Sequence, residues 1–235
     1  MNSNKAKSKS VLSLIVNITI IVITAYAMSK FFMSTGDANM QVSGIRSFKY
    51  FTNLSNYFAA IAALICIPYN VKDIRKGTNL LPRGVYLTKF YATVTVTVTF
   101  LTCVFFLAPI NILILAPYGV PPVRAYLFMF AGNTFILHFL TPVLSILSVI
   151  LLDATEGFDK KYVKYGMVFV FLYAILYVVM VVFIGPEKGG WTDFYHFTFG
   201  GKMYMAPVSG VVMLFFTWLI ARCEWKLYRK ANNEE

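Results

Sequence analysis

Six long apolar stretches constrain this chain more than any other feature of its sequence. Each has few charged residues over about 20 positions, the length that an α-helix needs to cross the hydrocarbon core of a bilayer. The predicted spans cover residues 11–32, 50–69, 85–108, 125–152, 162–184 and 203–221. Only 13% of the residues are charged, which is too little to cover a water-exposed surface. The sequence therefore predicts an all-α polytopic membrane protein, with residues 1–235 forming a single bundle of six transmembrane helices.

Two local patterns are also typical of other structures. Lysines precede the first apolar stretch, and Ala25-Tyr26-Ala27 resembles a signal-peptidase site. The apolar run continues past that site to Phe32, so we predict a retained span. Threonine and valine alternate strictly over residues 93–99, as in a strand. A membrane β-barrel would need this alternation in every segment, and the other segments lack it, so we predict a helix here too.

The basic residues predict the orientation in the membrane. With six spans and the N-terminus in the cytoplasm, 15 of the 21 Lys and Arg residues lie on the cytoplasmic side. The positive-inside rule then places both termini in the cytoplasm. The net charge of +11 is interpreted in the same way, as topology signals and contacts to anionic lipid. No nucleic-acid-binding motif is present, so we predict no nucleic acid partner.

A first polar cluster lies at the predicted outer end of the second span. Thr52, Ser55 and Asn56 are spaced i, i+3 and i+4, so a helix that starts near Ile45 presents them on one face. That face should point into the bundle. Such residues commonly form hydrogen bonds between membrane helices, but polar groups at membrane depth are also candidates for a functional site.

A second polar cluster follows one stripe of the fourth span. Its members are Thr134, His138, Thr141 and Ser145, with Asn133 nearby. His138 is the only histidine in a predicted span. Pro142 cannot donate a hydrogen bond to the carbonyl of His138, so the sequence predicts a kink there. The alternatives are a packed imidazole beside a kink and a functional site.

Together the two clusters contain the groups needed for nucleophilic catalysis. A hydroxyl such as that of Thr52 attacks poorly until a base takes its proton, and His138 is suited to that task. We expect Asn56 to be the donor to an oxyanion, Ser55 and Asn133 to be further polar groups of the site, and Ser55 to be the reserve nucleophile. The nearest acid, Asp153, lies about 22 Å from His138 along the helix, so no Ser-His-Asp type of triad is predicted.

The last predicted outer loop, residues 185–202, is rich in glycine and aromatic residues. Trp191 and Tyr195 are typical of anchors at the membrane interface. The alternative is that Asp193 and His196 form the lip of a substrate entrance. Two histidines and three cysteines at unrelated spacings predict neither a metal site nor a cofactor.

Three short motifs carry a resemblance to a known family. They are Phe51-Thr52-Asn53-Leu54-Ser55-Asn56, Leu137-His138 with Pro142 four residues on, and Gly190-Trp191. In these the chain resembles a bacterial family of six-helix membrane proteins that is distantly similar to the androgen-induced membrane threonine hydrolases of fatty acid esters of hydroxy fatty acids. The resemblance implies a bacterial plasma-membrane enzyme that acts on lipid or fatty acyl esters, with Thr52 as the nucleophile and His138 as the base. The residues after Gly190-Trp191 lack the prolines of the bacterial pattern, so no role of this loop follows from the family.

We therefore expect an intramembrane hydrolase of fatty acyl esters. The alternative is a non-enzymatic membrane protein, a small-solute transporter or a scaffold, in which the same residues form interhelical contacts. Distance separates the two, because catalysis requires the hydroxyl of Thr52 or Ser55 within hydrogen-bonding reach of His138, or one water away.

Overall fold

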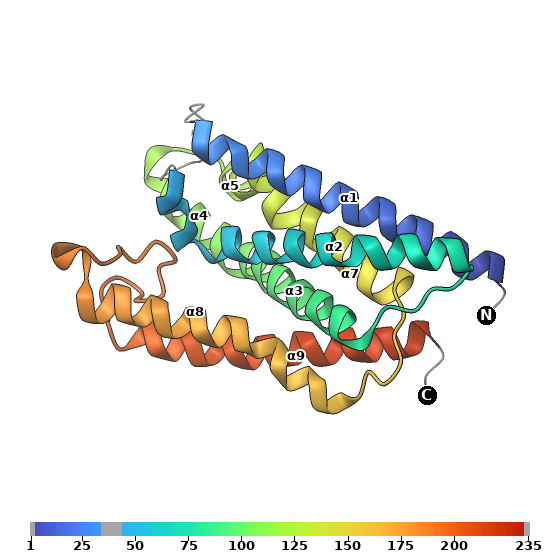
Figure 1. Ribbon diagram of the computed structural model, residues 1–235. Coiled ribbons are helices and arrows are strands. Elements are labelled where there is room, and N and C mark those ends of the chain that lie inside the picture. Colours follow the sequence, from blue (N-terminus) through green and yellow to red (C-terminus); the bar gives the residue numbers. More distant parts are fainter. Residues whose placement is uncertain (1–2, 34–43, 233–235) are drawn as a thin grey trace.

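The computed structural model describes residues 3–33 and 44–232, and this part of the chain is an all-α bundle (Figure 1). Its helices include six that are long and apolar enough to cross a membrane, which confirms the predicted fold class. These spans are Ser3–Phe32, Phe51–Lys76, Arg83–Tyr118, Asn133–Leu152, Lys160–Ile184 and Met205–Ala231. The protein is an integral membrane protein of six helices.

Several spans are built from more than one kind of helix. In chain order the elements are α1 (Ser3–Met33), η1 (Gly44–Lys49), α2 (Phe51–Lys76), α3 (Arg83–Thr102), η2 (Cys103–Leu107), α4 (Ala108–Leu115), η3 (Ala116–Tyr118), α5 (Pro122–Leu127), η4 (Phe128–Phe130), α6 (Asn133–Phe135), η5 (Ile136–Leu140), α7 (Thr141–Leu147), η6 (Ser148–Leu152), η7 (Lys160–Met167), α8 (Val168–Val178), η8 (Val179–Ile184), η9 (Pro186–Lys188) and α9 (Met205–Ala231). Of these, η2, η5, η6 and η8 are π-helical and the other η elements are 3₁₀-helical.

The observed bounds of several spans differ from the predicted ones. α1 begins at Ser3 and α9 continues to Ala231, because helices run on past the apolar window into turns with basic side chains. The fourth span was predicted too long, at 125–152. Residues 122–130 instead form the short helices α5 and η4, and the chain turns at Gly132, where φ is +58°. Apolar composition alone does not distinguish such short helices from the span that follows them.

The second span starts within one residue of the predicted position 50, but the α-helix does not begin earlier, near Ile45, as expected. The segment around Ile45 is the 3₁₀-helix η1, and the α-helix begins only at Phe51. Thr52 is therefore in the first turn of α2 rather than two turns into it. This shift brings it to the end of the helix, beside the loop that precedes α9.

The disruption expected at His138 takes the form of the π-helical turn η5, residues Ile136–Leu140. The amide of Thr141 bonds to the carbonyl of Ile136, which widens the helix by one residue in this turn. Pro142 follows at once and has no amide hydrogen to restore the regular pattern. Wide turns of this kind often occur at functional sites.

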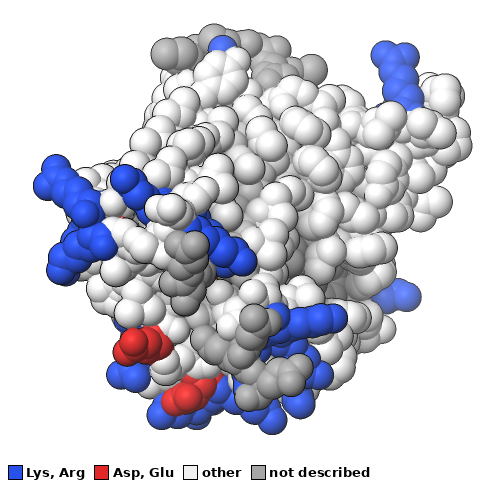
Figure 2. All heavy atoms as spheres, turned by 90° about the vertical axis from the view of Figure 1, so that its right-hand side faces the viewer, with Lys and Arg blue, Asp and Glu red and all other residues white. Residues whose placement is uncertain are grey.

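α3 lies in the middle of the bundle (Figure 1). It contacts α2, α7 and α9, while α1 packs along α2 and α8 packs along α9. Both ends of the described chain lie at the same end of the bundle (Figure 1). Lys and Arg side chains surround this end (Figure 2). That distribution is the basis of the predicted orientation, and the cytoplasmic placement of this end stays a prediction.

A buried ion pair joins three helices near the end that carries the termini. Lys89 Nζ of α3 lies 2.6 Å from Asp153 Oδ2, just after η6, and both side chains are buried. The other carboxylate oxygen accepts a hydrogen bond from Ser13 Oγ of α1 at 2.5 Å. Ser148 Oγ accepts a bond from Lys89 at 2.7 Å. An ion pair in hydrocarbon needs such additional hydrogen bonds to be tolerated.

Candidate functional site

The structure brings Thr52 and His138 together, although 86 residues separate them in sequence. Thr52 Oγ1, in the first turn of α2, lies 3.4 Å from His138 Nε2 in η5. The imidazole is 7% exposed and Thr52 is half-buried. The contact joins the first turn of α2 to the π-helical turn η5. The distance is at the long end for a hydrogen bond.

The second nitrogen of His138 determines which tautomer is present. Nδ1 lies 2.8 Å from the carbonyl oxygen of Met129 and 3.4 Å from Cys103 Sγ. A carbonyl can only accept, so Nδ1 carries the hydrogen and donates it to Met129. Nε2 then has a free lone pair, and the Thr52 hydroxyl donates to it. A backbone carbonyl thus orients this imidazole, in the position that a carboxylate holds in a Ser-His-Asp triad.

The geometry of η4 makes the Met129 carbonyl available. This 3₁₀-helix, Phe128–Phe130, ends where Ala131 is extended and Gly132 has a positive φ. The carbonyls at a helix end have no partner within the helix. The chain reversal at Gly132 folds η4 back over η5, so that one of these carbonyls reaches the histidine. The sequence contained no indication of this contact.

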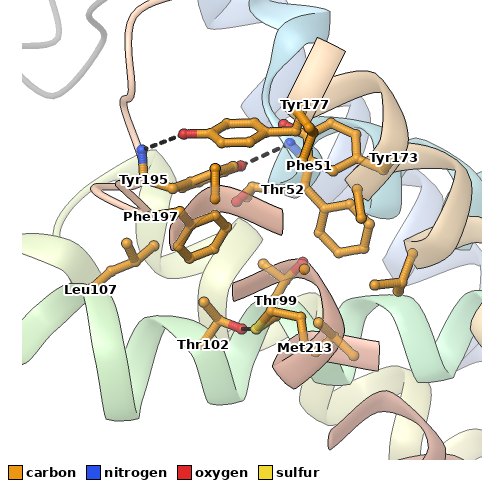
Figure 3. A pocket seen from close by; sticks show the side chains of 16 residues that line it. Phe51, Thr52, Thr99, Thr102, Leu107, Tyr173, Tyr177, Tyr195, Phe197 and Met213 are labelled. Atoms are coloured by element: carbon orange, nitrogen blue, oxygen red, sulfur yellow. Dashed lines mark hydrogen bonds between the residues drawn. The ribbon is translucent and has the colours of Figure 1, made fainter. Parts of the chain in front are cut away.

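Tyr195, in the loop before α9, covers the start of α2. Its hydroxyl accepts a hydrogen bond from the Phe51 amide at 2.8 Å, and it also interacts with the amide and hydroxyl of Thr52. Figure 3 shows the phenol pointing toward the first turn of α2 from the loop. Burial raises the pKa of Tyr195 to about 12. The phenol therefore keeps its proton at neutral pH and is able to donate it to an oxygen placed beside Thr52.

Two of the predicted oxyanion groups have other roles. Asn56 Nδ2 donates to the carbonyls of Thr52 at 2.7 Å and Leu137 at 3.0 Å, so both amide hydrogens are in use. Ser55 Oγ donates to the Thr52 carbonyl at 3.0 Å and lies 2.9 Å from Thr99 Oγ1. Neither side chain is free to act on a substrate, because both are committed to holding α2 against its neighbours.

Asn133 is buried at the start of α6 and does not line the cavity beside Thr52. Thr134 donates to the carbonyl of Ala131 at 2.6 Å, on the exposed side of the turn. The predicted polar stripe of the fourth span is therefore only partly internal. Its buried members, apart from the histidine, are Thr141 and Ser145, whose hydroxyls have no hydrogen-bond partner among the described residues.

Asp193 fastens the loop that carries Tyr195. Its carboxylate accepts hydrogen bonds from the Tyr177 hydroxyl at 2.6 Å, the Phe197 amide at 2.9 Å, and the amide and hydroxyl of Thr198 at 2.7 and 2.5 Å. Burial favours the neutral carboxyl, but these bonds outweigh it and hold the pKa of Asp193 below its ordinary value. Asp193 thus positions Tyr195 from within the loop and does not form the lip of an entrance.

His196 and Trp191 of this loop do not contact Thr52 or His138. His196 is exposed and has a φ of +57°, and Trp191 packs against Tyr173 and Tyr177. The role of His196 as part of an entrance has no support in these contacts. The contact of Tyr195 with the start of α2 was not predicted, because an aromatic loop before a span is equally typical of membrane anchoring.

A small cavity lies against Thr52. Its volume is about 50 Å³, and its walls come from α2, α3, η2, α8, α9 and the loop with Tyr195 and Phe197 (Figure 3). A larger groove of about 830 Å³ adjoins it along α3 and α9. Four residues line both spaces: Val98, Thr102, Phe197 and Met213. Thr52 therefore borders an apolar space that continues into the groove.

Within residues 3–33 and 44–232, no three His, Cys, Asp or Glu side chains come together in an arrangement that could hold a metal ion. Comparison of the chain with protein-family models, with curated proteins and with solved structures found no match. The family resemblance thus remains an expectation that rests on the three short motifs.

Proposed function

We propose that this protein is an intramembrane hydrolase of lipid esters in a bacterial plasma membrane, with Thr52 as the nucleophile and His138 as the base. The observation that supports this most strongly is the contact between Thr52 Oγ1 and the unprotonated nitrogen of His138, at 3.4 Å. A hydroxyl in contact with a correctly oriented imidazole is the minimal unit of nucleophilic catalysis.

In the first half of the reaction, Thr52 Oγ1 attacks the carbonyl carbon of the ester and its proton passes to His138 Nε2. The tetrahedral intermediate collapses by breaking the bond to the alcohol oxygen, which takes the proton from Nε2. In the second half, His138 takes a proton from water, and the hydroxide attacks the acyl–Thr52 ester. Collapse returns the proton to Thr52 Oγ1 and releases the fatty acid.

Tyr195 is the oxyanion donor in this proposal, in place of Asn56. Its phenol is protonated at neutral pH, and its oxygen is held beside Thr52 by the Phe51 amide. The first turn of α2 adds the partial positive charge of a helix N-terminus, which favours a developing oxyanion. Both effects act on charge that exists only during the reaction.

The substrate class follows from the walls of the site. The cavity beside Thr52 has room for an ester group but not for a long acyl chain. We place the chain in the adjoining groove, whose walls are almost entirely apolar. The substrates are therefore membrane-dissolved fatty acyl esters, and no cofactor enters any step.

A second candidate is a non-enzymatic role, in which the polar residues hold helices together. The hydrogen bonds of Asn56 and Ser55 favour it, because both side chains bind the backbone or side chain of a neighbouring helix. The decisive difference is whether Thr52 reacts.

The test is hydrolysis of long-chain acyl esters by the purified protein in detergent. We expect Thr52→Val and His138→Gln to lower kcat roughly a thousandfold, because each removes one member of the reacting pair while keeping its size. Thr52→Ser keeps a hydroxyl and should retain measurable turnover. A fluorophosphonate probe should label the wild type and Thr52→Ser but not Thr52→Val.

Two matched controls separate chemistry from folding. Thr88→Val removes an exposed threonine hydroxyl that bonds only within its own helix, and His196→Asn replaces the exposed histidine with a residue that tolerates a positive φ. Both should keep full activity. A folded wild type that hydrolyses none of the esters and takes up no probe would exclude the hydrolase and favour the structural role.

A further inference from the structure

The groove between α3 and α9 contains one acidic side chain that the proposed chemistry does not use. Glu224 is on α9, three residues before Leu227, the last residue of α9 that lines the groove, and it is 4% exposed. Its Oε1 accepts a hydrogen bond from Thr97 Oγ1 at 2.6 Å. Nothing among the described residues donates to Oε2. A carboxyl group with one unbonded oxygen therefore borders a largely apolar space.

A carboxylate at this position needs a positive partner. Removing an ion from water costs several kcal/mol, and a carboxyl group without a counter-charge or several hydrogen bonds takes up a proton instead. A cation that binds beside Glu224 would favour the ionised form of the carboxyl group and be held by it. No Lys or Arg lines the groove. The buried cation of α3, Lys89, is paired with Asp153, and Arg222 lies over the ring of Trp218, 5.2 Å from its centroid. Within the described residues, Glu224 thus lacks a cationic partner.

The walls of the groove are suited to an organic cation. Five phenylalanines line it: Phe105, Phe106, Phe197, Phe199 and Phe216. The face of an aromatic ring attracts a positive charge, and this attraction strengthens where water is excluded. The volume of about 830 Å³ falls in the range of pockets that hold drug-sized ligands. Phe105 and Phe216 are 75% and 51% exposed, so the groove opens on the surface of the bundle, where a ligand enters from the lipid.

We infer that the groove binds a lipophilic organic cation, whose charge is compensated by Glu224 and whose apolar groups pack against the phenylalanine rings. The inference does not depend on ester hydrolysis, because it rests on the charge and shape of the groove. Since the groove adjoins the cavity at Thr52, the cation would occupy the space that we assign to an acyl chain.

The test compares two probes of the same shape and opposite charge, tetraphenylphosphonium and tetraphenylborate. Binding to the purified protein in a non-ionic detergent is measured by equilibrium dialysis. We expect saturable binding of tetraphenylphosphonium and none of tetraphenylborate. Glu224→Gln keeps the size of the side chain and removes its charge, so it should weaken binding of the cation by at least roughly tenfold.

Two further variants complete the experiment. Glu156→Gln removes the charge of an exposed acid outside the groove and should leave binding unchanged. Val212→Trp fills the groove from a half-exposed position on α9 and should abolish binding of the cation. This variant tests the groove independently, in case Glu224→Gln does not fold. Equal affinity of the wild type and Glu224→Gln for the cation would overturn the inference, as would equal binding of the two probes or unchanged binding by Val212→Trp.

Discussion

A single backbone carbonyl determines the tautomer of His138. Met129 fixes the hydrogen on Nδ1, which leaves Nε2 as an acceptor for Thr52. A carbonyl orients the ring but carries no full negative charge, so it stabilises the imidazolium less than a carboxylate would. The carbonyl holds the ring in place in the ground state, with Nε2 free to accept a proton. Both conditions are compatible with a base that holds its proton only briefly during the reaction.

The proposed donor to the oxyanion can be tested at one atom. Tyr195→Phe removes the phenol hydroxyl and keeps the ring, so the loop should still pack. We expect kcat for ester hydrolysis to fall roughly a hundredfold with little change in KM, because the donor acts on the transition state more than on the bound ester. Steady-state kinetics measure this. A rise in KM alone would instead assign Tyr195 to substrate binding.

Two buried serines should respond differently to the loss of their hydroxyls. Ser55 Oγ has two partners, whereas Ser145 Oγ is buried without one. Ser55→Ala should therefore lower the free energy of unfolding by about 1 kcal/mol, and Ser145→Ala should be neutral or stabilising. Thermal unfolding of the two variants in the same detergent gives the comparison. Destabilisation by Ser145→Ala of the same size would show that its hydroxyl has a partner in solution.

The conformation of the loop before α9 depends on hydrogen bonds to the ionised carboxyl group of Asp193. The pKa of Asp193 is below its ordinary value in the folded protein, so the folded state binds fewer protons than the unfolded state in the range between the two pKa values. Stability from this group is complete above the unfolded pKa of about 4 and is lost as the pH falls through the folded pKa.

This sign leads to a prediction for acid conditions. The wild type should lose thermal stability as the pH falls below about 4. Asp193→Asn should start from a lower melting temperature at neutral pH and lose less on acidification, because its amide has no charge to lose. Asp159→Asn changes an exposed acid and should follow the wild type. Parallel curves for the wild type and Asp193→Asn would contradict this assignment.

On the scale of the whole molecule, one ion pair connects helices that are far apart in sequence. Lys89 and Asp153 are both buried, and Ser13 of α1 completes the contact. Lys89→Met leaves the carboxylate buried without its counter-charge and should cost about 3–5 kcal/mol of stability. The double variant Lys89→Met/Asp153→Leu removes both charges and should recover most of this loss. Equal instability of the single and double variants would show that the pair contributes no coupling.

The sequence predicted the two residues of the candidate pair better than the residues that surround them. His138 is conspicuous as the only histidine in a predicted span, and Thr52 was chosen from its polar cluster by the family resemblance, so each was identified without knowledge of its neighbours. The structure gives Asn56 and Ser55 hydrogen bonds to other protein groups in place of the predicted contact with a substrate, because hydrogen-bonding capacity is visible in a sequence but its use is not. Glu224 was missed because the predicted sixth span ended at residue 221, although Thr217, Ala221, Glu224 and Tyr228 form one buried stripe of α9.

What the sequence determined by itself is the set of six spans, because a bilayer imposes the same length and polarity on every helix that crosses it. The polar residues within those spans can likewise be identified from each segment alone. Only the tertiary structure decided that Met129 orients His138, that Tyr195 covers the start of α2, and that Glu224 borders a groove. Those contacts join segments far apart in the chain, and they depend on where each helix starts, turns and packs, which no single segment specifies.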